Sequence, residues 1–281
     1  MDEQQFERFV QEVAPLESVT YWLTQFEQAK SKQIQAMINV ALLYKQHKNY
    51  DEMYALLDEA TLMEDPYAFY ELANCYFESL GNRGNEQLAF ELYERAALLD
   101  HADAMNNLAD MYFNGEGTEV DERKAFEWFT KAAHVGVAEA KYTLGIMYEQ
   151  GIGTEQSDEF ALQHYEQSAI EGYAEAMYRM GMIYFTGELG QKQNTVHAFD
   201  WFLKAAEQFH VDAIFNVAYC YEMGEGTTQN EENAIHYYKQ ASMLGDYEAS
   251  NKLAGIYELR KSEQANKWRK KAIEQFNNEE M

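Results

Sequence analysis

The sequence repeats itself with a period close to 36 residues. Segments of one pattern begin at Ala68, Ala104, Ala140, Ala176, Ala213 and Ala249, and their starts differ by 36 or 37 residues; a weaker copy begins at Ala36. A period of this length is typical of solenoids, in which each small unit buries its apolar face against the next one. The repeat therefore predicts a stacked array of helical units rather than one globular core.

Each copy has the pattern of a helix hairpin. After Ala140 come Leu144, Gly145 and Tyr148, at offsets that place all four on one helical face. The small residue in this set lets a second helix approach closely. That second helix is also visible in the sequence, for example as KAFEWFTKAAHVG at residues 124–136.

A Gly-x-Gly segment separates the two helices of most copies. Gly115 and Gly117 form one such pair, and Gly151 and Gly153 form another. A chain that leaves a helix needs positive φ, which glycine adopts at little cost. We therefore expect these glycines to turn the chain from the first helix to the second.

The pattern A-x-x-x-L-G-x-x-Y-x-x-G-x-G, followed by K-A-x-x-W-x-x-K-A-A, resembles the Sel-one-like repeat (SLR) family, which is related to tetratricopeptide repeats. The resemblance covers residues 36–281. It implies an all-α fold, a right-handed α-solenoid superhelix of about seven helix hairpins, and a scaffolding role that is rarely catalytic. We place the repeats at 36–67, 68–103, 104–139, 140–175, 176–212, 213–248 and 249–281, the last one a shortened cap. Residues 1–35 are expected to form a helical N-terminal cap.

The charge of the chain is strongly negative. It has 22 Lys and Arg against 48 Asp and Glu, a net charge of −26, which repels nucleic acid and anionic membranes. The sequence contains neither a secretory signal nor an apolar run long enough to span a bilayer, and its 2 cysteines are too few for a disulfide framework. We expect a cytoplasmic protein that favours basic partners, binds no nucleic acid and does not insert into membranes.

Three non-core positions of the first helices share one helical face: an acid just before the leading Ala, a residue two places after it, and a residue nine places after it. Rings offer rigid contact area and cation–π faces, and carboxylates accept hydrogen bonds from Arg. The bland alternative is that the acids only favour the helix dipole and the rings belong to the family pattern. We predict a concave groove for a protein partner, lined by Tyr70, Phe77, Asp103, Asn106, Phe113, Glu139, Tyr142, Glu149, Glu175, Tyr178, Phe185, Asp212, Phe215, Glu222 and Glu248.

The sequence gives little support for catalysis. Cys75 and Cys220 occupy a slot that Met or Ile fills in sister repeats, so we expect buried apolar cysteines. The histidines lack the spacing of a zinc site, and the Gly-x-Gly segments follow helices rather than strands, so the context of a phosphate cradle is missing. We expect no enzymatic activity, no metal and no cofactor.

Three functions remain open from the sequence. The first is a scaffold or inhibitor that wraps a basic protein, for example a bacterial immunity protein that neutralises a cationic toxin. The second is an adaptor of a signalling or envelope complex whose binding does not depend on charge. The third is a β-lactamase-like hydrolase, because some cysteine-rich relatives have been linked to that activity, but the paired cysteines of those relatives are missing here.

Overall fold

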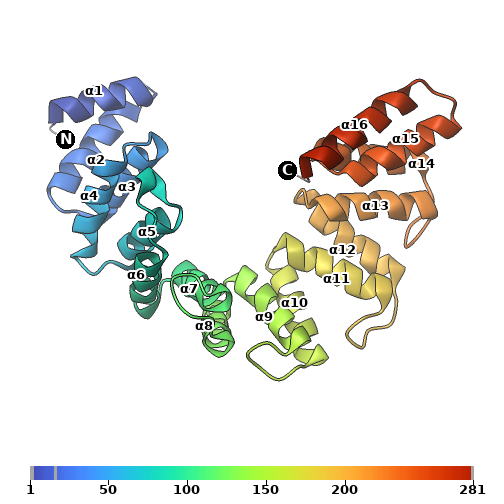
Figure 1. The fold of residues 1–281 in the computed structure, drawn as a ribbon, viewed down its shortest axis with the longest axis horizontal. Coiled ribbons are helices and arrows are strands. Elements are labelled where there is room, and N and C mark those ends of the chain that lie inside the picture. Colours follow the sequence, from blue (N-terminus) through green and yellow to red (C-terminus); the bar gives the residue numbers. More distant parts are fainter. Residues whose placement is uncertain (1–2, 16–17, 280–281) are drawn as a thin grey trace. The chain divides into compact units, whose positions relative to one another are not determined.

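The computed structural model describes residues 3–15 and 18–279, and every regular element in these ranges is helical. The predicted N-terminal cap and solenoid also include residues 1–2, 16–17 and 280–281, which lie outside the described residues. The all-α fold is confirmed (Figure 1). The α-helices are α1 (Glu3–Val13), α2 (Val19–Lys30), α3 (Ile34–Gln46), α4 (Tyr50–Thr61), α5 (Pro66–Phe77), α6 (Glu86–Leu98), α7 (Ala102–Asn114), α8 (Glu122–His134), α9 (Ala138–Gln150), α10 (Asp158–Ile170), α11 (Ala174–Thr186), α12 (Thr195–Glu207), α13 (Val211–Met223), α14 (Glu231–Met243), α15 (Tyr247–Leu259) and α16 (Gln264–Glu279).

Consecutive helices pack as hairpins, among them α5 with α6, α7 with α8, α11 with α12 and α13 with α14 (Figure 1). The small residue of the repeat makes this packing possible. A Cβ atom added to Gly145 would lie 2.6 Å from the Tyr165 ring, and one added to Gly181 would lie 2.5 Å from the Phe202 ring. Real Cβ atoms do not approach so closely, so a larger residue would push the two helices apart.

The Gly-x-Gly segments turn the chain as predicted. Gly115 ends α7 with a φ of 76°, and Gly117 follows with a φ of 66°. A side chain on Gly117 would also meet the carbonyl oxygen of Glu86, 2.2 Å from the position of its Cβ. The first glycine therefore caps its helix, and the second lets the loop touch the preceding hairpin.

The second helices begin at capping side chains that recur with the repeat. Each of these side chains accepts a hydrogen bond from the backbone N–H three residues later, and such a cap stabilises a helix by about 1 kcal/mol. The capping residues are Asn85, Asp121, Ser157, Asn194 and Asn230.

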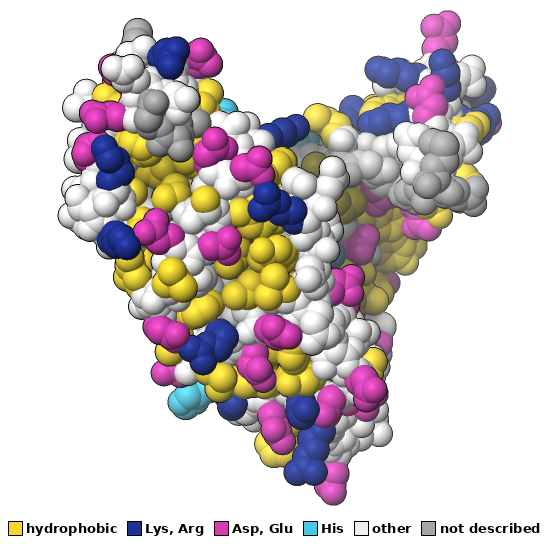
Figure 2. All heavy atoms as spheres, turned by 60° about the vertical axis from the view of Figure 1, so that its left-hand side comes forward, with side chains coloured by type: hydrophobic (Ala, Val, Ile, Leu, Met, Phe, Trp, Pro, Cys, Tyr) yellow, Lys and Arg dark blue, Asp and Glu magenta, His cyan; other side chains and the backbone are white. Residues whose placement is uncertain are grey.

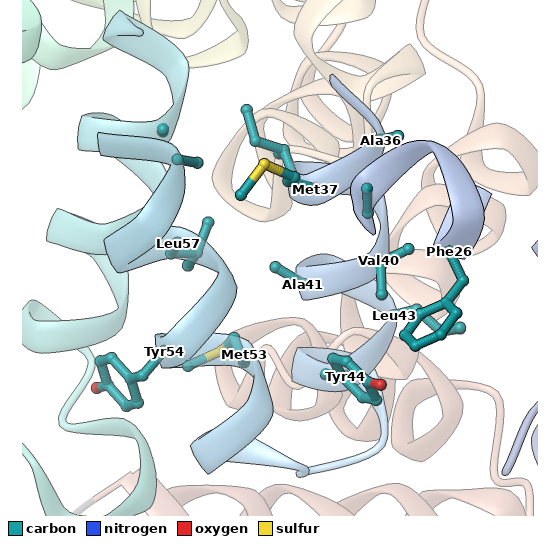
Figure 3. Close-up of a cluster of buried hydrophobic side chains, with 14 of the residues drawn as sticks. Phe26, Ala36, Met37, Val40, Ala41, Leu43, Tyr44, Met53, Tyr54 and Leu57 are labelled. Atoms are coloured by element: carbon teal, nitrogen blue, oxygen red, sulfur yellow. The ribbon is translucent and has the colours of Figure 1, made fainter. Parts of the chain in front are cut away.

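The chain divides into two compact units. The N-terminal unit comprises Met1–Ala140 with Ile152–Thr154, and the C-terminal unit comprises Lys141–Gly151 with Glu155–Met281. In the N-terminal unit, side chains from α2, α3 and α4 face one another in a continuous cluster around Met37, Tyr44 and Leu57 (Figure 3). In the C-terminal unit, the buried rings of Tyr165, Phe202 and Tyr238 fill the spaces between successive hairpins.

Apolar side chains also reach the surface of both units. Figure 2 shows one face of the molecule, on which they lie in patches among acidic and basic side chains. Leu62 and Leu98 are exposed in the N-terminal unit, and Phe209 and Met243 are exposed in the C-terminal unit. Within residues 3–15 and 18–279, no helix combines the length and apolar character needed to cross a bilayer.

Candidate functional site on the first helices

The acids predicted to line a groove are exposed in the first turn of their helices. There they face the positive end of the helix dipole, which by itself accounts for about 0.3–1 kcal/mol of stability. Their placement therefore allows both a role in the fold and a role in binding. These residues are Asp103, Glu139, Glu175, Asp212 and Glu248.

Most of the predicted rings are half-buried. The exception is Phe77, which is 41% exposed and packs edge-on against the Tyr93 ring. A ring held in this way presents a rigid apolar surface at little further entropic cost. The half-buried rings are Tyr70, Phe113, Tyr142, Tyr178, Phe185 and Phe215.

The prediction is wrong for Asn106, whose side chain is only 4% exposed. Its amide Nδ2 donates to Oδ2 of Asp110 at 3.1 Å, and its Oδ1 is buried without a hydrogen-bond partner. A partner therefore cannot reach Asn106 directly.

Two histidines hold rings of this face in place. The Tyr70 ring stacks on His101 at a centroid distance of 4.4 Å, and the Tyr178 ring stacks on His210 at 4.5 Å. Both histidines cap a first helix, because Nδ1 accepts a hydrogen bond from the N–H of Ala104 or Ala213. Burial lowers the pKa of His101, which favours the neutral ring that can accept this bond. Sequence reasoning missed this role.

Glu149 is used by the fold itself. Its carboxylate accepts a hydrogen bond of 2.7 Å from the Tyr165 hydroxyl and one of 2.6 Å from the Arg179 guanidinium. Arg179 also donates to Glu188 at 2.6 Å. Burial and the hydrogen bond to Glu149 both raise the pKa of the Tyr165 hydroxyl. The negative charge of Glu149 is therefore compensated inside its own unit.

The same arrangement recurs at Glu222, two repeats further along the chain. Its carboxylate accepts from the Tyr238 hydroxyl at 2.5 Å and from the Lys252 ammonium at 3.2 Å. In both cases the tyrosine lies 16 residues after the glutamate and the cation 30 residues after it. We call each set of Glu, Tyr and cation a carboxylate clasp.

The C-terminal unit contains a hollow of about 790 Å³ at the first turns of α13 and α15. Three carboxylates and three rings contribute to its lining, and there is no Lys or Arg among the described residues that line it. We call it the acidic hollow. The residues in question are Asp212, Asp246, Glu248, Tyr178, Phe215 and Tyr247.

Two smaller hollows adjoin the acidic hollow, since all three share Phe215. One of about 670 Å³ reaches Glu222 and Lys252, and one of about 260 Å³ reaches Phe185. The structure therefore brings together six predicted residues, namely Tyr178, Phe185, Asp212, Phe215, Glu222 and Glu248. The other predicted residues do not line these hollows: Tyr70, Phe77, Asp103, Asn106, Phe113, Glu139, Tyr142, Glu149 and Glu175.

Asp246 and Tyr247 complete the acidic hollow and were missed from the sequence. The Asp246 carboxylate caps α15 by accepting from the Ala249 N–H at 2.8 Å, and burial raises its pKa. The sequence contains a signal for Asp246, because Asp, Asn, Ser and His recur as capping residues just before the helices of this repeat.

The structure offers little for covalent or metal chemistry. Cys75 and Cys220 are buried as expected, and burial raises the pKa of each thiol to about 12, so neither is a thiolate at neutral pH. Among the residues that the structure describes, no three His, Cys, Asp or Glu side chains converge as metal ligands. The hollows are instead the kind of surface on which a polypeptide side chain can rest.

Stacked helix hairpins with such a surface define an α-helical repeat protein. The Sel1 repeat matches residues 66–101, 102–137, 138–173, 174–208 and 211–246, more than half of the chain. The chain therefore belongs to the Sel1 repeat family, whose members are in general non-enzymatic scaffolds for protein–protein interaction.

Solved structures agree on the fold. A Sel1 repeat protein from Oxalobacter formigenes has a TM-score of 0.77 at 24% identity, over 84% of this chain and 99% of that one. A protective antigen of uropathogenic Escherichia coli, with an SLR fold, has a TM-score of 0.75 at 23% identity, over 98% of this chain and 64% of the antigen.

One curated relative matches a short stretch of the chain. Chitin synthase regulatory factor 2 of Schizosaccharomyces pombe is 41% identical over 72 residues. The match spans 26% of this chain and only 14% of the yeast protein.

Proposed function

We propose that this chain is a non-enzymatic scaffold that holds a basic polypeptide segment against its first helices, with the acidic hollow as the main contact. The observation that carries the proposal is the lining of that hollow, where three carboxylates and three rings meet without a Lys or Arg among the described residues. A Lys or Arg side chain placed there can donate hydrogen bonds to carboxylates and make a cation–π contact in one site. The net charge of −26 speeds the approach of such a partner.

The proposal extends to location and partner class. An acidic Sel1 repeat protein of this kind would act in the cytoplasm, and a cationic toxin is one partner with suitable charge, which would make the chain an immunity protein. Support for a cationic partner comes from charge and from the acidic hollow alone. Most residues of the acidic hollow lie on or next to the first helices α11, α13 and α15, and the second helix α16 contributes Gln275 and Asn278.

Capture experiments with two matched variants test this proposal. In the hollow variant, Asp212→Asn and Glu248→Gln remove two exposed first-turn acids from α13 and α15. In the control variant, Glu159→Gln and Glu232→Gln remove two exposed first-turn acids from the second helices α10 and α14. Both variants lose the same charge and the same helix-dipole contribution, so they differ only in the face that is neutralised.

Proteins captured by each form are identified by mass spectrometry. We expect the wild type and the control variant to retain one partner with an excess of Lys and Arg, and the hollow variant to lose it. Equal capture by both variants, or a partner without excess positive charge, would refute the proposal.

A charge-independent adaptor is favoured by a different observation. The hollow of about 260 Å³ beside Phe185 is lined by Tyr178, Met182, Phe202, Phe215, Asn216, Tyr219 and Cys220, and none of these lining residues is charged. Such a hollow suits an apolar side chain of a partner. If this mode dominates, Phe215→Ala weakens binding at least as much as the hollow variant does, and the hollow variant keeps most of its affinity.

A further inference from the structure

The second helices of this protein end in a recurring turn with one residue at positive φ. In the turn after α8, the N–H of Gly136 donates to the Ala133 carbonyl and the N–H of Val137 donates to the Ala132 carbonyl. This pair of bonds is the Schellman motif, in which the left-handed residue is usually glycine. Gly172 and Gly245 occupy the same place after α10 and α14, both with positive φ.

Phe209 occupies this place after α12. Its N–H donates to the Ala206 carbonyl, the N–H of His210 donates to the Ala205 carbonyl, and its φ is 63°. A bulky side chain is strained in the left-handed region, whereas glycine is not. Phe209 and His210 also fall between two matched Sel1 repeats, because the fourth match ends at residue 208 and the fifth begins at residue 211.

The strain at Phe209 is not offset by burial of its ring, because the residue is 73% exposed. An aromatic ring stabilises a fold through the apolar area that it removes from water, and most of this ring stays in water. A glycine here would form the same turn without strain. The stability of the chain alone therefore gives no reason for Phe at this position.

The Phe209 ring instead forms one side of an apolar pocket of about 480 Å³ between α12 and α14. The buried Ile214 lines this pocket together with Leu203 and Tyr237. Met243 also lines it and is 78% exposed. Glu207 is the one charged side chain among the described residues that line it. The pocket lies on the second helices and is separate from the acidic hollow, although Leu244 borders both.

We infer that this pocket, which we call the Phe209 pocket, is a second docking site that binds the apolar face of an amphipathic, basic helix of a partner protein. Phe209 and Met243 are the walls between which its apolar side chains insert, as in other helix-in-groove complexes. The inference goes beyond the proposed function, since it concerns another surface and recognises apolar side chains.

Charge determines which partner fits. A second copy of this chain would bring another net charge of −26 to the surface, which opposes self-association. Lys or Arg beside the apolar face of a partner helix would be attracted both by the chain as a whole and by Glu207 at the pocket. An acidic or neutral helix would lack this attraction.

Phe209→Gly is the decisive variant. It removes the ring from the pocket and places the residue preferred at positive φ, so we expect the midpoint of thermal unfolding to stay equal or to rise. Ile170→Ala is the control, since it removes an exposed apolar side chain of the same unit, at the end of α10 and outside the Phe209 pocket.

The probe is a synthetic 18-residue amphipathic peptide of Leu and Lys, with a shuffled peptide of identical composition as its control. Binding is measured by fluorescence anisotropy. We expect the amphipathic peptide to bind wild type more tightly than the shuffled peptide does. We expect Phe209→Gly to weaken the affinity for the amphipathic peptide by about tenfold or more, as for an interface hot spot. Ile170→Ala should leave this affinity unchanged.

Three results would overturn the inference. The first is that the shuffled peptide binds as tightly as the amphipathic one. The second is that the Phe209→Gly protein unfolds at a lower temperature than wild type. The third is that wild type forms a dimer that the Phe209→Gly substitution dissociates. The proposed function is tested separately, by the capture experiments with the hollow variant and the control variant.

Discussion

The hairpins α9–α10 and α11–α12 differ at one repeat position, where the first has a charged hydrogen-bond network and the second has an aromatic contact. Near the end of α9, Glu149 is joined to Tyr165 and Arg179 in a carboxylate clasp. Near the end of α11 the corresponding residue is Phe185, whose ring packs against Phe202.

The comparison shows that the charge of the first-helix face is not one uniform field. The clasped carboxylates Glu149 and Glu222 are compensated within the fold, whereas the acidic hollow has no Lys or Arg in its described lining. Removing a clasped charge should therefore change stability, and removing an acid of the hollow should change binding.

The largest expected effect breaks the stronger clasp. Arg179→Ala leaves Glu149 and Glu188 without the guanidinium that both contact, in a site where the Arg179 side chain is only 22% exposed. We expect a loss of about 2–3 kcal/mol in the free energy of unfolding, measured by urea unfolding. A loss below about 0.5 kcal/mol would show that the clasp contributes no more than a surface ion pair.

A designed exchange sharpens the same point. Glu149→Phe with Tyr165→Phe and Arg179→Asn copies the arrangement of Phe185, Phe202 and Asn216 into the neighbouring hairpin. Replacing a charged network by apolar groups of similar volume is often neutral. We expect this triple variant to be clearly more stable than Arg179→Ala alone. Equal stability of the two variants would mean that the arrangements are not interchangeable.

A smaller effect concerns Asp110 in α7, beside the buried Asn106. Burial raises the pKa of Asp110 to about 7, and Glu139 and Glu116 act in the same direction. Because the folded state holds this proton more tightly than the unfolded state, its contribution to stability is full below about pH 4 and is lost as the pH rises through about 7.

Asp110→Asn should remove this dependence. We expect the variant to be more stable than wild type by about 1–2 kcal/mol at pH 8 and to differ less at pH 5, as measured by urea unfolding at both values. Asp103→Asn, an exposed acid on the same helix, is the control. A variant that is less stable at pH 8 would show that the carboxylate is ionised and favourable in the folded protein.

The smallest effect breaks the weaker clasp. The Lys252 side chain is 40% exposed, so water screens its interaction with Glu222. We expect Lys252→Ala to cost about 0.5–1 kcal/mol in the free energy of unfolding. If Lys252→Ala costs as much as Arg179→Ala, the exposure of the cation does not determine how much each clasp contributes to stability.

Much of the fold could be predicted from the sequence because its signals are local. The alternation of small and aromatic residues predicts the close helix contacts at Gly145 and Gly181, and the Gly-x-Gly segments predict turns of positive φ such as Gly115. These features depend on neighbours within one hairpin, and each is repeated along the chain.

The candidate site could be predicted only in part. The exposure of a side chain depends on the next hairpin as well as on its own, which is why Asn106 was wrongly placed on an open surface and why the clasp of Glu149 with Arg179 was missed. Phe209 stands where sister repeats have Gly136, Gly172 and Gly245, but its positive φ was recognised only in the structure.

The central claim is that the acidic hollow captures a basic polypeptide. Its most direct test is the association rate of the basic partner at low and high salt, for wild type, the hollow variant and the control variant. We predict that the rate for wild type and for the control variant falls by about tenfold or more between roughly 0.05 and 0.5 M salt, and that the hollow variant starts slower and falls less. The same salt dependence for both variants would assign capture to the overall charge, and a rate independent of salt would contradict the claim altogether.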